Sequence, residues 1–368
     1  MRLASSSLLH HLLLRLYYPF LLLVGLVMAG LIAYLATFLG QRGLLRPVLI
    51  MGILLLGLTV LQVLWAACFV WSLPVLSNEM ELRLPRKQHP VLYEYVEQIA
   101  EERQLLGPDA IRLAPDTIAH VYEEQDGKKI LVLGGLAIAA LTQEALAGVI
   151  AHELAHFAGG DTRLSRRGFR RLLIIAVLES RFHGQAAAYL NPLLWLVRLY
   201  HFSYRLAWAA HSRAQEYAAD RHTVAQVGKY AAGAALIYLT VPERLPWVRL
   251  SSIAETCAAT DQPMDKIFAE QHRLAKAVTP VEWEEALRKE LKERTTLFDS
   301  HPCLKERLAA LGVSPRKALQ AALDQAGPQA LALLPQWEKL EKELTCRLMI
   351  AYREQHFAKM ELWQMIRD

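Results

Sequence analysis

Residues 141–161 read LTQEALAGVIAHELAHFAGGD, and this stretch predicts a helix that packs against a protein core. Thr142 can cap the N-terminus of the helix, and Glu144 suits the positive end of its dipole. Four apolar residues recur along one face at helical spacing. They are Leu146, Val149, Ile150 and Leu154.

The same helix contains an HExxH pattern, formed by His152, Glu153 and His156. Because positions i and i+4 share one face of a helix, both imidazoles can reach a single metal ion. Two neutral imidazoles and a carboxylate suit zinc, and Glu153 can act on a water at such a site. The alternative is a helix whose histidines make only ordinary hydrogen bonds. One class of zinc protease adds a third histidine, but Thr162 stands at that position and Asp161 is one residue out of register.

A better third ligand lies in residues 211–222, which read HSRAQEYAADRH. Glu216 and Asp220 are again four residues apart on a predicted helix. In such an arrangement Glu216 binds the metal, and Asp220 accepts a hydrogen bond from a ligand histidine and so orients it. The alternative is a solvated helix face on which Arg213 and Arg221 pair with the two carboxylates.

Two long uncharged stretches precede this region and predict an N-terminal membrane hairpin over residues 1–78. The expected helices cover about residues 16–41 and 47–73. At ~1.5 Å per residue, each can cross a hydrocarbon core of ~30 Å. A signal peptide is disfavoured because the first apolar run is too long. A buried pair of helices in a soluble protein is the other alternative.

Basic residues set the expected orientation of this hairpin. The turn between the helices carries Arg42 and Arg46, whereas the outer flanks carry Arg2, Arg15, Arg83, Arg86 and Lys87. The excess on the flanks favours a cytoplasmic catalytic domain, and the four cysteines, which form no CxxC, fit a reducing compartment. We expect an integral protein of a bacterial inner membrane.

The remainder of the chain predicts an α+β, mostly helical fold with a small β-sheet. We expect a catalytic domain over residues 79–313 and a helical C-terminal extension over 314–368. Expected elements of the catalytic domain are a helix at 89–106 and strands at 110–114, 118–122 and 130–133. An apolar stripe in the extension faces either the core or a partner helix. It consists of Leu334, Trp337, Leu340, Leu344 and Leu348.

Three motifs follow one another along the chain: HELAH at 152–156, SRAQEYAAD at 212–220, and Ser300-His301-Pro302 followed by Glu306-Arg307-Leu308. In this order the chain resembles the HtpX-like and CAAX prenyl endopeptidase-like family of membrane-associated zinc metalloendopeptidases. The resemblance covers about residues 16–311. It implies a zincin-type (gluzincin) metalloprotease domain behind a transmembrane helical hairpin, with one Zn²⁺ per chain.

The resemblance also implies roles for individual residues. His152, His156 and Glu216 would bind zinc, with Glu153 as general base and acid. In addition, Asp220 would support a ligand histidine, His301 would stabilise the oxyanion, and Arg213 would brace the site through an ion pair.

The chain departs from the family pattern in two places. The strand that lines the substrate cleft often carries Asn-Ala in the family, but Ile118-Ala119-His120 stands at the corresponding place. The backbone edge of that strand can still bind an extended peptide. Residues 172–178 are too short to span a membrane, and 186–210 are interrupted by charges. We expect these to be helices that cover the site or lie at the membrane surface.

These observations predict a membrane-anchored zinc endopeptidase that acts on polypeptides in membrane-protein quality control or protein processing. The alternatives are a non-catalytic membrane scaffold that keeps the metal site structurally, and a partner-binding module whose C-terminal extension binds a helical partner or a second copy. The small net charge of +5 does not suggest a nucleic-acid partner.

Overall fold

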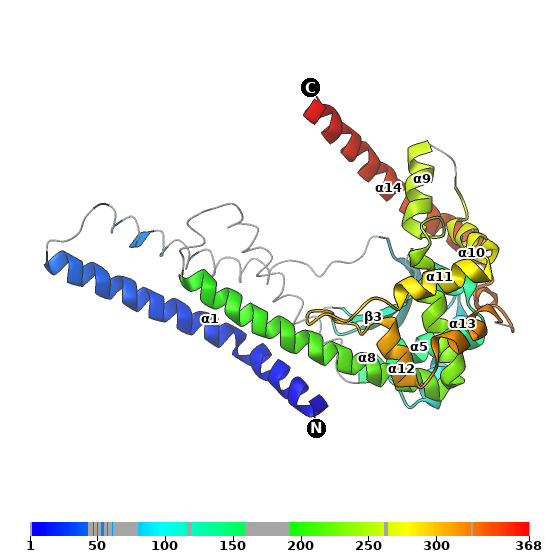
Figure 1. The fold of residues 1–368 in the computed structure, drawn as a ribbon, viewed down its shortest axis with the longest axis horizontal. Coiled ribbons are helices and arrows are strands. Elements are labelled where there is room, and N and C mark those ends of the chain that lie inside the picture. Colours follow the sequence, from blue (N-terminus) through cyan, green and yellow to red (C-terminus); the bar gives the residue numbers. More distant parts are fainter. Residues whose placement is uncertain are drawn as a thin grey trace. The chain divides into compact units, whose positions relative to one another are not determined.

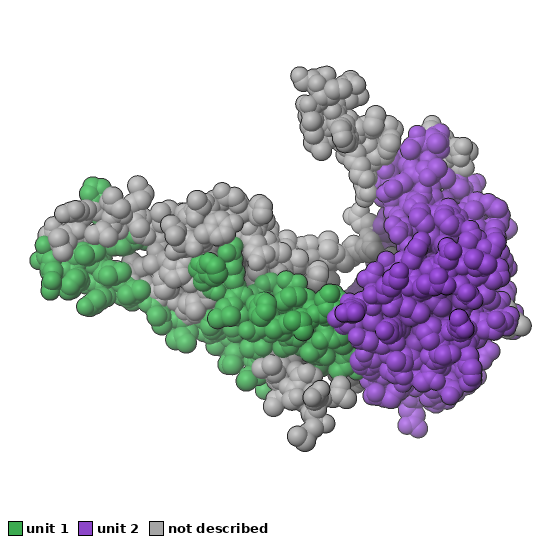
Figure 2. All heavy atoms as spheres, in the orientation of Figure 1, with its two compact units in different colours: residues 1–75, 164–214, 296–300 green, residues 76–163, 215–295, 301–368 purple. Residues whose placement is uncertain are grey.

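A computed structural model describes residues 2–42, 80–115, 119–124, 126–158, 192–260, 264–324 and 327–367, with six isolated residues between 47 and 61. The chain divides into two compact units (Figure 2). The first comprises residues 1–75, 164–214 and 296–300, and the second comprises 76–163, 215–295 and 301–368. We describe each unit by itself.

The first unit contains the long helix α1 (Arg2–Gln41), drawn in blue in Figure 1. This helix includes the first predicted membrane helix and starts earlier, at Arg2. The second predicted membrane helix, at 47–73, falls outside the described residues apart from single positions. Tyr200 packs against α1, with its ring centroid 4.3 Å from that of Phe20 in a stacked arrangement.

The second unit is built on a mixed sheet of four strands in the order β1-β2-β4-β3. The strands are β1 (Leu82–Leu84), β2 (Ala110–Ala114), β3 (His120–Glu123) and β4 (Lys129–Gly134). β2 and β4 pair in parallel, whereas the two outer pairs are antiparallel. The predicted strand at 110–114 has the observed bounds, and those at 118–122 and 130–133 differ by one or two residues. β1 was not predicted.

The hairpin between β3 and β4 turns at Asp126-Gly127, a pair that is typical of tight hairpin turns. Gly127 has a φ of 89°, and its N–H donates to the carbonyl of Glu124 at 3.0 Å. Glycine reaches this left-handed conformation without a steric penalty. The turn leaves β3 at the edge of the sheet.

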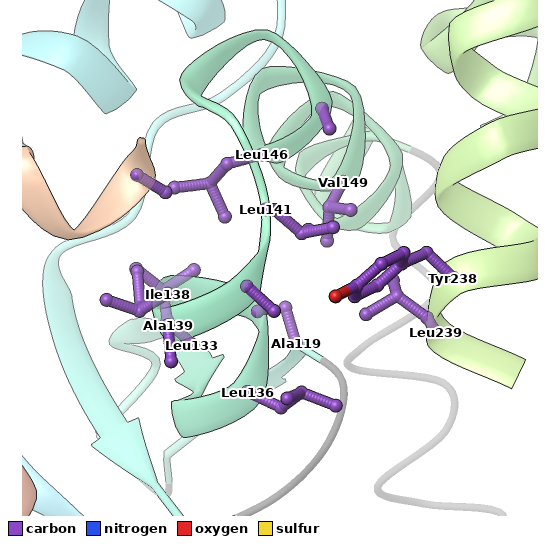
Figure 3. Packing of buried hydrophobic residues seen from close by; sticks show 14 of the residues in the cluster. Ala119, Leu133, Leu136, Ile138, Ala139, Leu141, Leu146, Val149, Tyr238 and Leu239 are labelled. Carbon is purple, nitrogen blue, oxygen red and sulfur yellow. The ribbon is translucent and has the colours of Figure 1, made fainter. Parts of the chain in front are cut away.

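Three helices follow or face the sheet: α3 (Pro90–Glu102), α4 (Gly135–Ala140) and α5 (Gln143–Ala158). α3 ends short of the predicted position, and Gln104 just beyond it adopts a positive φ of 54°. Figure 3 shows buried side chains of α4, α5 and α8 in one cluster, among them Ile138, Leu146 and Tyr238. The predicted apolar face of α5 therefore packs into the core.

α8 (Pro192–Thr240) carries the predicted third ligand near its middle. Of residues 186–210, expected to be helices that cover the site or lie at the membrane surface, 192–210 belong to α8 and continue into that segment. Residues 186–191 and the expected helix at 172–178 lie outside the described residues. The helix is interrupted at Gly228, which has a φ of 77°. Among the described helices, the stretch Arg198–Arg244 is long and apolar enough to cross a membrane, although 44% of its most apolar window is buried inside the protein.

The C-terminal half of the second unit is helical. Its elements are η1 (Val241–Arg244), α9 (Leu250–Thr260), α10 (Ile267–Ala277), α11 (Pro280–Glu290), α12 (Leu304–Leu311), α13 (Pro315–Leu323), η2 (Ala330–Leu333) and α14 (Trp337–Arg367). The apolar stripe at Leu334, Trp337, Leu344 and Leu348 is at most 8% exposed and belongs to the main hydrophobic core. It faces the core, one of the two orientations that its spacing allowed.

Candidate metal centre

α5 and α8 carry the three predicted metal ligands, and a glycine on α5 lets the two helices pack closely together. Gly148 lies four residues before His152, on the same face of α5. A Cβ atom at Gly148 would come within 3.0 Å of Val227 and 3.2 Å of Thr223, both on α8. Larger residues are therefore disfavoured here. This close contact brings α5 and α8 together along the face that carries the i, i+4 pairs of the two helices.

The donor atoms of His152, His156 and Glu216 all lie within 4.8 Å of one another. Nε2 of His152 is 3.4 Å from Oε2 of Glu216, and Nε2 of His156 is 3.8 Å from Oε1. Bonds of ~2.0–2.1 Å to a tetrahedral zinc ion would place two ligand atoms ~3.3 Å apart. The residue types and these separations therefore fit zinc with three protein ligands and one open position.

Asp220 lies behind His152. Its Oδ1 is 3.2 Å from Nδ1 of His152, so this carboxylate accepts a hydrogen bond from the imidazole. The bond leaves Nε2 of His152 as the nitrogen directed at Glu216. A carboxylate that fixes the tautomer of a ligand histidine is a recurring feature of zinc sites.

Arg307, on α12, holds Asp220 in turn. Its guanidinium donates from Nε to Oδ2 at 3.0 Å and from Nη2 to Oδ1 at 2.5 Å, in a two-pronged arrangement. Nη1 also lies 3.5 Å from Oε2 of Glu216. Arg307 belongs to the third sequence motif, but the sequence alone indicates no role for it. A buried carboxylate such as Asp220 needs a cationic partner. The sequence does not indicate which residue is the partner, because Arg307 lies far along the chain.

The environment shifts the pKa of each group in the site. Burial raises the pKa of Glu153 to about 7, because loss of water disfavours the carboxylate. Burial, aided by the charge of His152, lowers the pKa of His156 to about 4. Burial also acts to lower the pKa of His152, but hydrogen bonds to Asp220 and then Glu216 outweigh it and raise the value to about 9.

His301 also reaches this cluster. Its Nδ1 hydrogen-bonds to Oε1 of Glu216 at 2.9 Å, and this bond raises the pKa of His301. The His301 side chain is 70% exposed, so the ring stands at the open side of the site. The following turn is held by the N–H of Cys303, which donates to Oγ1 of Thr295 at 2.8 Å.

Arg213 lies in the first unit, unlike the other predicted site residues. Its Nη1 donates to the backbone carbonyl of Asp299 at 2.6 Å and approaches that of Leu297 at 3.5 Å. These hydrogen bonds go to loop backbone rather than to a site carboxylate. Arg307 makes an ion pair with Asp220 of the kind that we expected from Arg213, whose own role stays a prediction.

The fold and the site together are those of an HExxH metallopeptidase, with a downstream glutamate close enough to serve as a third ligand. A family model for peptidase family M48 matches residues 87–313. The chain belongs to this family, which comprises the HtpX- and CAAX-type zinc metalloendopeptidases. It is therefore a zinc metalloendopeptidase, as the motifs predict, and polypeptides are its substrates. A comparison with curated proteins finds no significant match.

We predict that Arg307→Met destabilises the metal-free protein by about 3 kcal/mol, because it removes the guanidinium from the buried carboxylates of Asp220 and Glu216 and leaves them with histidine partners alone. Chemical denaturation of the EDTA-treated protein measures this change. Arg273→Met is the matched control. Arg273 pairs with Glu270 on the surface, where its side chain is 64% exposed, and the change should cost less than ~1 kcal/mol. Equal unfolding midpoints for the two variants would contradict the role of Arg307.

Proposed function

We propose that this chain is a membrane-anchored zinc endopeptidase whose metal ligands are His152, His156 and Glu216. The observation that carries the proposal is the convergence of three ligand atoms within 4.8 Å, with Glu153 buried beside them. Zinc binding alone does not need a glutamate between the two histidines. A buried carboxyl at that position supports catalysis over a purely structural metal site.

When bound, zinc would supply Lewis acidity toward the attacking water and the scissile carbonyl. Glu153 takes a proton from the water during attack and returns it to the leaving amine. Burial raises the pKa of Glu153 toward the working pH, which favours a group that must both accept and release a proton.

Three further side chains position the proposed metal ligands and the substrate. Asp220 holds the His152 ring in one orientation and one tautomer, and Arg307 holds Asp220. His301 bonds Glu216 through Nδ1, so its Nε2 can donate to the substrate oxygen on which negative charge develops. In this role His301 acts from the solvent side, and its exposure supports such access to a peptide.

The edge strand β3 supports binding of an extended peptide by strand addition. Ile118-Ala119-His120 carries no side-chain amide, so amide recognition of the kind found in the family has no counterpart at this position. We propose that backbone hydrogen bonds of β3 provide the affinity here. Such binding tolerates varied sequences, which suits a protease of membrane-protein quality control or general processing.

We predict that Glu153→Gln retains zinc but loses at least ~10²-fold in kcat, because the amide cannot accept the proton of the attacking water. Zinc content and cleavage of casein in detergent measure the two effects. Glu144→Gln, on the exposed first turn of the same helix, is the control and should keep wild-type activity. Full activity in Glu153→Gln would exclude the proposed general base.

Membrane anchoring is supported by the apolar surface of the first unit. Five large residues of α1 are 45–62% exposed in the structure: Leu23, Leu26, Val27, Leu31 and Tyr34. On α8, Trp195, Leu199 and Phe202 are 50–62% exposed. So much exposed apolar surface is unusual in a soluble monomer and suits a lipid environment. We propose that α1 and residues 47–73 span a bacterial inner membrane.

We propose that the catalytic domain lies in the cytoplasm, and this orientation predicts from which side of the membrane a maleimide labels Cys346. Cys346 is exposed on α14, whereas Cys257 is buried. With the other cysteines replaced by serine, a membrane-impermeant maleimide should label Cys346 in inverted vesicles and not in right-side-out vesicles. A cysteine in place of Gly43, in the turn of the proposed hairpin, should show the opposite pattern. Labelling of both sites from the same side would refute the hairpin.

A further inference from the structure

The N-terminal end of the HExxH helix is held by a segment from beyond the family-matched region. Residues 327–334, here called the clamp segment, lie beside the junction of α4 and α5. The N–H of Gln143, the first residue of α5, donates to the carbonyl of Pro328 at 2.8 Å. The N–H of Ala330 donates to the carbonyl of Leu141 at 2.9 Å. Together these bonds form a short antiparallel bridge across the junction.

This bridge provides an acceptor for the first N–H group of α5. The first N–H groups of any helix lack partners within the helix. Oγ1 of Thr142 accepts from the N–H of Ala145 at 3.2 Å, and the clamp segment satisfies the N–H of Gln143. The first turn of α5 therefore depends on a carbonyl that lies far away in the sequence.

The clamp segment is itself fixed in the core. Ala330, Leu333 and Leu334 are at most 4% exposed and belong to the same hydrophobic cluster as α4 and α5. At its start, Gly327 is exposed and has a φ of 132°, a conformation that favours glycine. The C-terminal end of the clamp segment is thus buried in the core. The turn at Gly327 precedes Pro328, whose carbonyl binds the junction of α4 and α5.

A second connection from the C-terminal region supports α4 from its other end. Glu341 of α14 accepts a hydrogen bond from the N–H of Ala269, at the start of α10, at 2.7 Å. Phe268 of α10 packs directly on the backbone of α4, since a Cβ atom at Gly135 would come within 2.5 Å of its ring. α14 therefore contacts α10, and α10 packs on α4, the helix that directly precedes α5.

We propose that the clamp segment is a positioning element for the active-site helix, so that its release lowers kcat and zinc affinity while KM changes little. The proposal rests on the assignment of His152, Glu153 and His156 to the site. All three side chains are carried by α5, and a helix moves as a rod. Catalysis is sensitive to displacements of ~1 Å, which can cost ~10²-fold in rate.

The test compares full-length variants that release the bridge with variants that keep it. Ala330→Pro removes the N–H that binds Leu141, and the extended backbone of Gln329 (φ −73°, ψ 144°) accepts a following proline. Ala330→Gly keeps the N–H. Gly327→Ala strains the exposed turn at the start of the clamp segment and adds no volume to the core. This variant tests the proposal if Ala330→Pro fails to fold. Thr279→Ala removes a helix cap of α11, away from the junction, and controls for general destabilisation.

We expect kcat to fall at least ~10-fold in Ala330→Pro and Gly327→Ala, with KM within ~2-fold and weaker zinc binding in competition with a chelator. Hydrogen exchange at the start of α5 should accelerate in the same two variants. Ala330→Gly and Thr279→Ala should match the wild type in all these readouts. Wild-type kcat, zinc affinity and exchange in folded Gly327→Ala, or an equal loss in Thr279→Ala, would overturn the proposal. A wild type without zinc-dependent cleavage would instead refute the site assignment.

Discussion

The site depends on one buried carboxylate, that of Asp220, which lies between the imidazole of His152 and the guanidinium of Arg307. A charge buried in this way is tolerated only when its oxygens are bonded to cationic or donor groups. Here the bonds join three helices, α5, α8 and α12, at one point. The arrangement fixes the ring of His152 in the absence of a metal, so the orientation of this proposed ligand is a property of the fold.

Packing around this point explains why the ligands can converge. Gly148 lets α8 approach α5 closely, and the i, i+4 spacing then presents His152 and His156 toward Glu216. Behind α5, the core is completed by helices from beyond residue 313. The C-terminal residues therefore contribute to the same hydrophobic core as the family-matched region.

Much of this could be predicted from the sequence, because the decisive signals are local. Spacing alone indicates that His152 and His156 share a helix face, and that Glu216 and Asp220 do likewise. The three strands with clear turn or apolar signals were also predicted. By contrast, β1 has three residues, and α4 is buried on all sides, so neither shows a period. Arg307 could not be assigned, because its bond to Asp220 joins residues 87 positions apart. The clamp segment escaped prediction for the same reason, since its bonds to Leu141 and Gln143 are backbone bonds without a sequence signature.

The proposed zinc ion is held by two imidazoles and one carboxylate of this chain. Zinc K-edge X-ray absorption of the zinc-loaded protein can measure this ligand set. We expect a first shell of nitrogen and oxygen atoms at ~2.0–2.1 Å, with outer-shell scattering from two imidazole rings. In His156→Ala the scattering from one ring should disappear. A sulfur shell at ~2.3 Å, or an unchanged spectrum in His156→Ala, would contradict the assignment of the site.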